Sequence, residues 1–177
     1  MRCLLLEKLL SWPGKSAARP DDPEHPAIYH MLDVAAVAEI LIARFGLNAA
    51  LRDALILLTA LHDLGKVNDQ FRKMLRGQPY QSNSHWCVTE VLLNAHDDIL
   101  AERLGSKQLR REPLYASVAG HHGQPSKWSG NDVHVLSVTG AEAVCDARAV
   151  IVAFSKLWPD ASLQAVSREE TLALSWW

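Results

Sequence analysis

A histidine and an aspartate, His62 and Asp63, stand side by side, and Leu64-Gly65-Lys66 follows them directly. The pair ends an apolar stretch with helical spacing, and consecutive helical positions diverge by only about 100°. Both side chains can therefore reach one point beyond the end of a helix. Because histidine is the commonest metal ligand among side chains, the pair predicts a site for a divalent cation.

Further histidines strengthen this interpretation, since a two-residue motif alone often arises by chance. They are His30, His85 and the double histidine His121-His122, which is flanked by glycines. Considered alone, His30 is more often a helix-cap or interface residue, and His85 a surface residue. Five histidines and one aspartate beside apolar segments favour a shared metal site.

Helical patterns surround these residues and must position them. Apolar residues recur at the spacing of one helix face from 33 to 45 and again from 49 to 64. His30 lies just before the first of these helices. The second delivers His62 and Asp63 to its last turn.

Three more helices are predicted in the middle of the chain. Asn68 can cap a short helix, and a helix from about 85 to 104 carries His85 in its first turn. A helix over 113–120 begins at a proline, a residue favoured at the first helical position. Its end presents the double histidine.

The remaining segments complete an all-α pattern. Residues 123–138 are typical of a loop, and capping-box spacings at Thr139 and Ser167 open two more helices, the first of which reaches Trp158. No strand alternation persists, and no linker or repeat divides the chain. We therefore expect an all-α, single-domain helical bundle over residues 1–177.

Composition limits the function classes. A net charge of −2 gives no general attraction to nucleic acid, so binding of a polyanion must depend on a local patch or on bound cations. The two basic clusters, at 72–76 and 103–111, are equally well explained as solvated helix faces. Three cysteines without C-x-x-C spacing favour a reducing compartment over a disulfide framework. The longest apolar run, 54–61, is too short to span a bilayer, so we expect a soluble cytoplasmic protein.

The predicted last helix has an unusual end, because it stops on Trp176 and Trp177 without a glycine, a proline or a basic last turn. Two terminal tryptophans expose more apolar area than a soluble domain normally leaves uncovered, unless the rings pack back onto the bundle. We favour the interpretation that the chain is the N-terminal piece of a longer polypeptide, cut within its last helix.

The order of these motifs resembles the HD nuclease domain of the CRISPR type I helicase-nuclease. The matching segments cover nearly the whole chain and are Trp12-Pro13-Gly14-Lys15-Ser16, His30 to Ala38, Ala60 to Lys66, Ser84-His85 and Val118 to Gly123. The set H…HD…H…HH is much more specific than HD alone, which marks a broad superfamily of metal phosphohydrolases.

The resemblance implies a centre with up to two divalent transition metal ions. In that family two cations share a bridging aspartate, and Asp63 matches it in this chain. A lysine of that family lies near the scissile phosphate, and Lys66 matches this lysine. The implied remaining ligands are His30 and His62 for one ion, and His85, His121 and His122 for the other. Two such ions activate a water and neutralise charge on the oxygens of a phosphodiester. Imidazole and carboxylate ligands suit Mn, Fe, Co, Ni or Zn better than Mg or Ca.

One ligand of that family has no match in this chain. The family completes its first metal site with an aspartate on a later helix, and the sequence stops at Trp177 before any such residue. Asp146 is a substitute, although it falls too early to match. We therefore expect the ion at His85, His121 and His122 to be held more securely than the other.

The roles of neighbouring residues stay open at this point. Lys66 is either the family's phosphate-side lysine or a solvated cation that complements a helix dipole. Asp33 either orients an imidazole or only belongs to a helix N-terminus. The histidines that match no motif are assigned to the surface, and these are His25, His96 and His134.

Three function classes follow. The leading hypothesis, by resemblance, is a metal-dependent endonuclease or exonuclease that cuts single-stranded DNA in CRISPR interference. Its partners would be a helicase domain in the same or a separate chain and an RNA-guided surveillance complex, with no membrane. The second class is an HD phosphohydrolase acting on nucleotides or cyclic dinucleotides, and the third is a non-catalytic helical docking module. No Walker A motif occurs in the chain.

Overall fold

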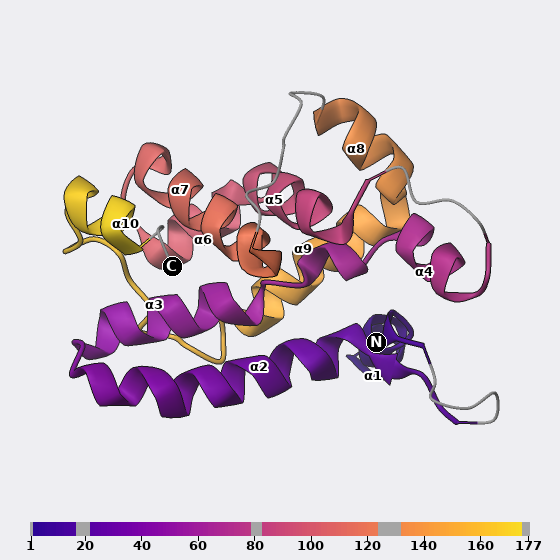
Figure 1. The fold of residues 1–177 in the computed structure, drawn as a ribbon, viewed down its shortest axis with the longest axis horizontal. Helices are drawn as coiled ribbons and strands as arrows, with labels where there is room; N and C mark the ends of the chain where they lie inside the picture. The colour runs from indigo at the N-terminus through magenta and orange to yellow at the C-terminus, as the bar shows by residue number, and fades with distance from the viewer. Residues whose placement is uncertain (1, 17–21, 79–82, 124–131, 175–177) are drawn as a thin grey trace.

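The computed structural model describes residues 2–16, 22–78, 83–123 and 132–174. In these ranges the chain is mostly helical (Figure 1), and the expectation of an all-α bundle is confirmed. The α-helices are α1 (Arg2–Leu10), α2 (Ala27–Ile42), α3 (Ala49–Ala60), α4 (Asp69–Leu75), α5 (His85–Ala95), α6 (Asp97–Leu104), α7 (Gln108–Ala119), α8 (Asp132–Thr139), α9 (Ala141–Phe154) and α10 (Arg168–Leu174). The short 3-10 helices are η1 (Ala43–Phe45), η2 (Leu64–Lys66) and η3 (Gly120–His122).

A two-stranded antiparallel sheet, which the sequence did not predict, lies before α2. Its strands are β1 (Pro13–Lys15) and β2 (His25–Pro26), and Lys15 pairs with His25. Strands this short leave no alternating pattern in the sequence.

The first two long helices, α2 and α3, run side by side along one edge of the molecule, with α5, α6 and α7 on the other side of α3 (Figure 1). α2 begins at Ala27, earlier than predicted, because the backbone N–H of Ala27 donates to the Trp12 carbonyl at 2.8 Å. His30 therefore lies in the first turn of α2 rather than before it. α3 ends at Ala60, so His62 and Asp63 occupy the turn between α3 and η2.

The predicted helix over 85–104 is two helices that meet at His96. This residue is 7% exposed, and its ring Nε2 lies 3.2 Å from the Val144 carbonyl on α9. The assignment of His96 to the surface is therefore wrong. The long-range bond to α9 holds the chain at the point where its direction changes.

Two predicted helix starts are also wrong. Pro113 lies inside α7, which begins at Gln108. Thr139 ends α8, where its hydroxyl donates to the Val135 carbonyl at 2.8 Å, and Gly140 with φ 99° precedes α9. A left-handed φ favours glycine, so a glycine rather than a capping threonine separates the two helices.

The second capping box is confirmed at the start of α10. The backbone N–H of Ser167 donates to Glu170 at 2.8 Å, and the N–H of Glu170 donates to the Ser167 hydroxyl at 3.1 Å. α8 occupies part of the segment predicted as a loop, whose residues 124–131 lie outside the described ranges. Trp176 and Trp177, on which the last helix was predicted to end, also lie outside them.

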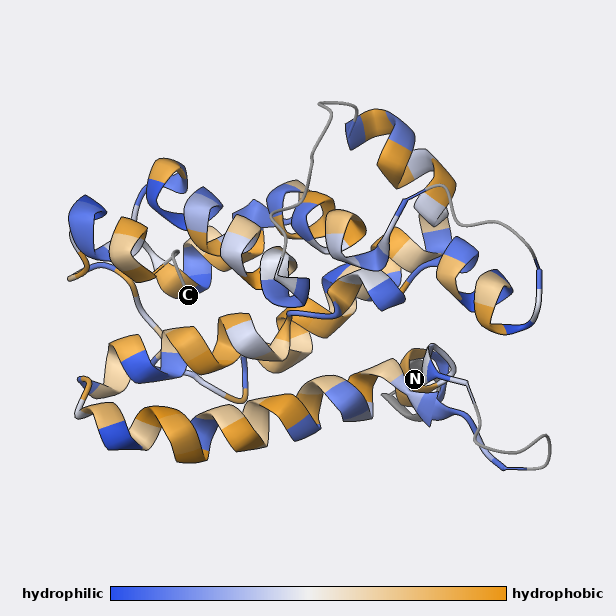
Figure 2. Cartoon of the chain, in the orientation of Figure 1, coloured by the Kyte–Doolittle hydropathy of each residue, from blue (hydrophilic) through white to orange (hydrophobic). Residues whose placement is uncertain are grey.

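The core joins both halves of the chain. Trp12 is 1% exposed, and its indole N–H donates to Asp146 on α9 at 3.0 Å. α2 is apolar along most of its length (Figure 2), and its Val37, Ile40 and Leu41 are exposed. Cys87 and Cys145 are free thiols. Among the described helices, none has the length and apolar character that crossing a membrane requires.

Candidate metal centre

The Asp63 carboxylate lies at the centre of the predicted site. Its side chain is only 3% exposed, although the residue sits in a turn. Atom Oδ2 lies 3.0 Å from His30 Nε2, 3.2 Å from His62 Nε2 and 2.8 Å from Lys66 Nζ. This oxygen therefore faces the residues implied for one metal ion, together with the lysine.

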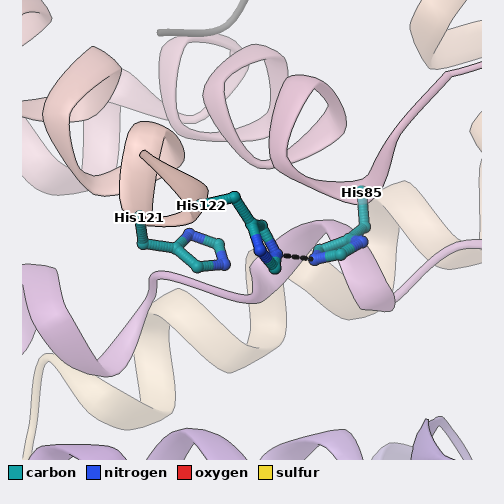
Figure 3. A group of neighbouring side chains, drawn as sticks. All are labelled: His85, His121 and His122. Atoms are coloured by element: carbon teal, nitrogen blue, oxygen red, sulfur yellow. Dashed lines mark hydrogen bonds between the residues drawn. The ribbon is translucent and has the colours of Figure 1, made fainter. Parts of the chain in front are cut away.

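The other carboxylate oxygen faces the opposite group of histidines. Oδ1 lies 3.3 Å from His85 Nε2 and 3.5 Å from His121 Nε2. His122 completes this group, because its Nε2 lies 3.0 Å from that of His85 (Figure 3). In Figure 3 the double histidine approaches His85 from a different segment of the chain.

The ligand atoms form two sets, each compact enough to hold one metal ion. His85, His121 and His122 make one set, and His30, His62 and Asp63 make the other, with the ligand atoms of each set within 4.8 Å of one another. Four elements supply them, namely α2, the α3–η2 turn, α5 and η3, and η2 adds Lys66 beside them. The structure thus brings together all six residues that the sequence singled out as ligands.

Close packing at Gly65 places the turn against α5. A Cβ atom at this position would lie 1.8 Å from the His85 carbonyl oxygen and 2.6 Å from the Thr89 backbone nitrogen. Only glycine lets the turn with Asp63 approach the start of α5 this closely. The approach sets the separation between Asp63 and His85.

Thr89, which the sequence analysis missed, ties the same turn to α5. Its fully buried hydroxyl accepts from the Gly65 N–H at 2.8 Å and donates to the His62 carbonyl at 3.2 Å. A threonine four residues after His85 lies on the same helix face, but that spacing alone does not distinguish it from an ordinary core residue.

Backbone carbonyls orient two of the imidazoles. His62 Nδ1 lies 2.9 Å from the Thr59 carbonyl, and His121 Nδ1 lies 3.0 Å from the Val118 carbonyl. Since a carbonyl only accepts, each Nδ1 carries the hydrogen. Each ring can keep this bond while its Nε2, which faces Asp63, either carries a proton or binds a metal ion.

The environment keeps Asp63 ionised and His30 neutral. Burial would raise the pKa of Asp63, but the imidazoles of His121, His62 and His85 outweigh it and hold that pKa well below its usual range. Burial, aided by the positive charges of Lys66 and Lys15, lowers the pKa of His30. An ionised carboxylate and a neutral imidazole are the forms that a metal ion requires of Asp63 and His30.

The residues fit a bound transition metal. Asp63 Oδ1 is buried and accepts no hydrogen bond of good geometry from the described residues, and an unsatisfied buried anion is costly. A cation would satisfy it. The donor set of imidazoles and one carboxylate matches Mn, Fe, Co, Ni or Zn better than Mg or Ca.

Lys66 is not a solvated helix-end cation, and that alternative is wrong. The residue is 7% exposed, with its ammonium group on Asp63 at 2.8 Å and over the Phe71 ring at 5.8 Å from the centroid. Its charge is directed into the site, where it partly neutralises the carboxylate.

Asp146 does not complete the centre, so the suggested substitution is wrong. One of its oxygens accepts from Trp12, and the other forms an ion pair with Lys8 at 2.8 Å. Both oxygens are therefore used to join α9 to the N-terminal segment. Neither of the two ligand sets includes Asp146.

Asp33 does not orient His30 either. It is 70% exposed and pairs with His25 at 3.4 Å. His25 is exposed as predicted, with its ring 6.4 Å from that of His30, and His134 is also exposed.

An apolar cleft of about 490 Å³ opens beside the centre. Its lining includes His62 and His121, together with apolar residues such as Leu55, Leu58 and Leu114. Space for a bound molecule therefore adjoins the side of the centre formed by these two histidines.

A helical domain in which an HD pair and further histidines gather around one aspartate belongs to the HD class of metal-dependent hydrolases. A family model described as "Cas3, HD domain" matches residues 12–176. The chain therefore belongs to the family of Cas3 HD domains, and the resemblance seen in the sequence is confirmed.

One solved structure, a crystal structure of T. fusca Cas3 with ADP, is similar in fold. Its TM-score is 0.62 at 20% sequence identity, with 94% of this chain and 22% of that chain covered. The chain thus spans about a fifth of the length of that protein. No curated protein matches the chain.

Proposed function

We propose that this chain is a metal-dependent nuclease domain that hydrolyses phosphodiester bonds of single-stranded DNA. The observation that carries the proposal is the position of Asp63, whose two oxygens face two separate groups of histidines. A carboxylate so placed can be shared by two cations. Membership of the Cas3 HD family supports a nuclease over other HD phosphohydrolases.

The proposed ligands divide between the two oxygens. His30 and His62 would hold one ion with Asp63 Oδ2, and His85, His121 and His122 would hold the other with Oδ1. Bound metals supply an activated water and neutralise charge on a phosphodiester. Of the two sets, the one with three histidines is the more complete, so we expect it to bind metal more tightly.

The chain's own residues have distinct tasks in this proposal. The Thr59 and Val118 carbonyls fix the tautomers of His62 and His121, and Lys66 holds a positive charge at the centre. Because this ammonium group lies beside Asp63, we assign it a contact with a non-bridging oxygen of the scissile phosphate. Lys66→Met should therefore lower kcat, whereas Lys66→Arg keeps the charge.

The proposed setting is CRISPR interference in the cytoplasm. A helicase domain, in the same or a separate chain, would feed the strand to this site, and an RNA-guided surveillance complex would recruit both. The family assignment supports this proposal. Hydrolysis of nucleotides or cyclic dinucleotides and a purely docking role are the outcomes that would displace it.

The test compares the chain with two aspartate variants. The proteins are incubated with Mn, Ni or Co, with circular single-stranded DNA and with a panel of nucleotides and cyclic dinucleotides. Asp63→Asn should abolish DNA cleavage, while the control Asp33→Asn, an exposed residue of α2, should keep it. Turnover of nucleotides without DNA cleavage, or equal activity of both variants, would overturn the proposal.

A further inference from the structure

Three arginines of the basic cluster at 103–111 are engaged in holding the fold. Arg103 donates to the Pro159 carbonyl at 2.6 Å, Arg110 to the Val166 carbonyl at 3.0 Å, and Arg111 is paired with Asp97 at 2.6 Å. The cluster at 103–111 therefore fastens the segment after α9 to the bundle. It is a poor candidate for binding a polyanion.

Lys15, by contrast, lies close enough to the candidate ligand His30 for its positive charge to lower the pKa of that residue. It pairs across the small sheet with His25, whose ring lies 6.4 Å from that of His30. The Lys15 side chain is exposed, and within the described part of the chain no carboxylate forms an ion pair with it. The nearby carboxylate of Asp33 pairs with His25 instead. Its positive charge is therefore open to a ligand.

The backbone around Lys15 is held firmly. A Cβ atom at Gly14 would lie 2.9 Å from the Ala27 Cα, so β1 packs directly on the start of the helix that carries His30. Buried Trp12 is bonded to Asp146, and its carbonyl accepts from Ala27. These contacts fix where the Lys15 side chain begins relative to His30.

We propose that Lys15 binds the backbone phosphate that neighbours the scissile phosphate, on the His30 side of the centre. This inference rests on the proposed function, because it assumes a nucleic-acid strand crossing Asp63. A lysine acts as a point charge towards a phosphate, and each such contact releases counterions on binding. In a chain with a net charge of −2, local contacts of this kind must supply the attraction to DNA.

A binding experiment tests the contact without cleavage. Fluorescence anisotropy measures the affinity of a phosphorothioate single-stranded oligonucleotide at several salt concentrations, with EDTA present so that no metal-dependent cleavage occurs. Lys15→Gln should lower the affinity about 3- to 10-fold at low salt and reduce the salt slope by about 0.7, the value for one phosphate on a single strand. Lys15→Arg should bind like the original chain.

The matched control is Lys107→Gln, which also removes one exposed lysine. Lys107 precedes α7, and the double histidine follows the other end of this 12-residue helix, about 18 Å away. This variant should bind like the original chain. Equal salt slopes for the original chain and Lys15→Gln, or an equal loss in Lys107→Gln, would overturn the inference.

A cleavage experiment locates the phosphate. One oligonucleotide carries an uncharged methylphosphonate next to the scissile linkage. The original chain should cut it more slowly than the normal oligonucleotide, whereas Lys15→Gln should cut both at the same rate. An equal slowing in both proteins would contradict the contact. If the chain binds through Lys15 but cuts no DNA, the nuclease proposal fails while the phosphate contact stands.

Discussion

Asp63 is a buried carboxylate. Its neighbours stabilise the charged form, although burial removes the water that would otherwise solvate it. The nearby imidazoles keep its pKa below the usual range despite burial, and Lys66 forms an ion pair with it at 2.8 Å. A site of this kind is not built for stability, because burying a charge is costly unless it is compensated. At the scale of single residues, the positions that hold Asp63 in place are therefore the informative ones to change.

Gly65→Ala should destabilise the fold and weaken metal binding. The added methyl group meets backbone atoms of His85 and Thr89, so the turn must move away from α5, at a cost of about 3 kcal/mol. Thermal unfolding and Mn titration measure the two effects. Gly77→Ala is the control, because it has φ 78° and nothing within 4 Å, and should cost only about 1 kcal/mol. Equal losses in both variants would show that the packing against α5 is unimportant.

Thr89→Val should also loosen the turn, although it keeps the side-chain shape. It removes the acceptor for Gly65 N–H and the donor to the His62 carbonyl, and leaving buried polar groups unpaired costs about 2 kcal/mol. Thr89→Ser retains the hydroxyl and should recover the Mn affinity of the original chain. Failure of serine to improve on valine would argue that the hydroxyl has no role.

At the scale of elements, the apolar periodicity predicted which segments are helical but not where they end. α2 extends back to Ala27 because of a bond to the Trp12 carbonyl, and the chain bends at His96 because its ring meets Val144. Both causes are contacts between residues far apart in the sequence. No local pattern contains them, which is why the predicted boundaries differ from the observed ones.

The candidate centre was more predictable than the boundaries. Its histidines and Asp63 occur in a recognisable order, and a family motif identifies them wherever the helices end. The contacts of Thr89 and the structural role of Asp146, which was wrongly suggested as a substitute ligand, were not predictable, because both depend on which partner lies across the fold. The assignment of each ligand to a metal ion stays a prediction.

The junction of α6 and α7 depends on a buried ion pair. Arg111 is 3% exposed and donates to both oxygens of Asp97, while Tyr115 donates to the same carboxylate at 2.7 Å. Arg111→Met should cost about 3 kcal/mol, since it leaves the Asp97 carboxylate without its charged partner. Chemical denaturation measures this loss. The exposed pair Arg148–Asp98 is the control, and Arg148→Met should leave the denaturation midpoint unchanged. A similar midpoint for both variants would contradict this account.

At the scale of the whole molecule, we expect stability to fall in mild acid. Burial lowers the pKa of His96 below its usual value of 6.5, so the unfolded chain binds more protons just below that pH. Stability is then fully present above about pH 6.5 and is lost as the pH falls towards the folded pKa, by at most about 1.4 kcal/mol per pH unit for one proton.

His96→Gln isolates this contribution, because the amide can still donate to the Val144 carbonyl. Denaturant unfolding at pH 7.5 and pH 5.5 should show a smaller difference in the free energy of unfolding for the variant than for the original chain. Identical differences would mean that His96 does not titrate differently in the folded state. The exposed His134 provides the control, and His134→Gln should leave the difference unchanged.

The whole fold also serves to bring five elements to one carboxylate, and the central claim is that Asp63 is shared by two metal ions. Anomalous diffraction from Mn-soaked crystals tests it most directly. We predict two peaks, one between Asp63 Oδ1 and the imidazoles of His85, His121 and His122, and a weaker one between Oδ2 and those of His30 and His62. A single peak, or a peak that does not contact Asp63, would contradict the central claim.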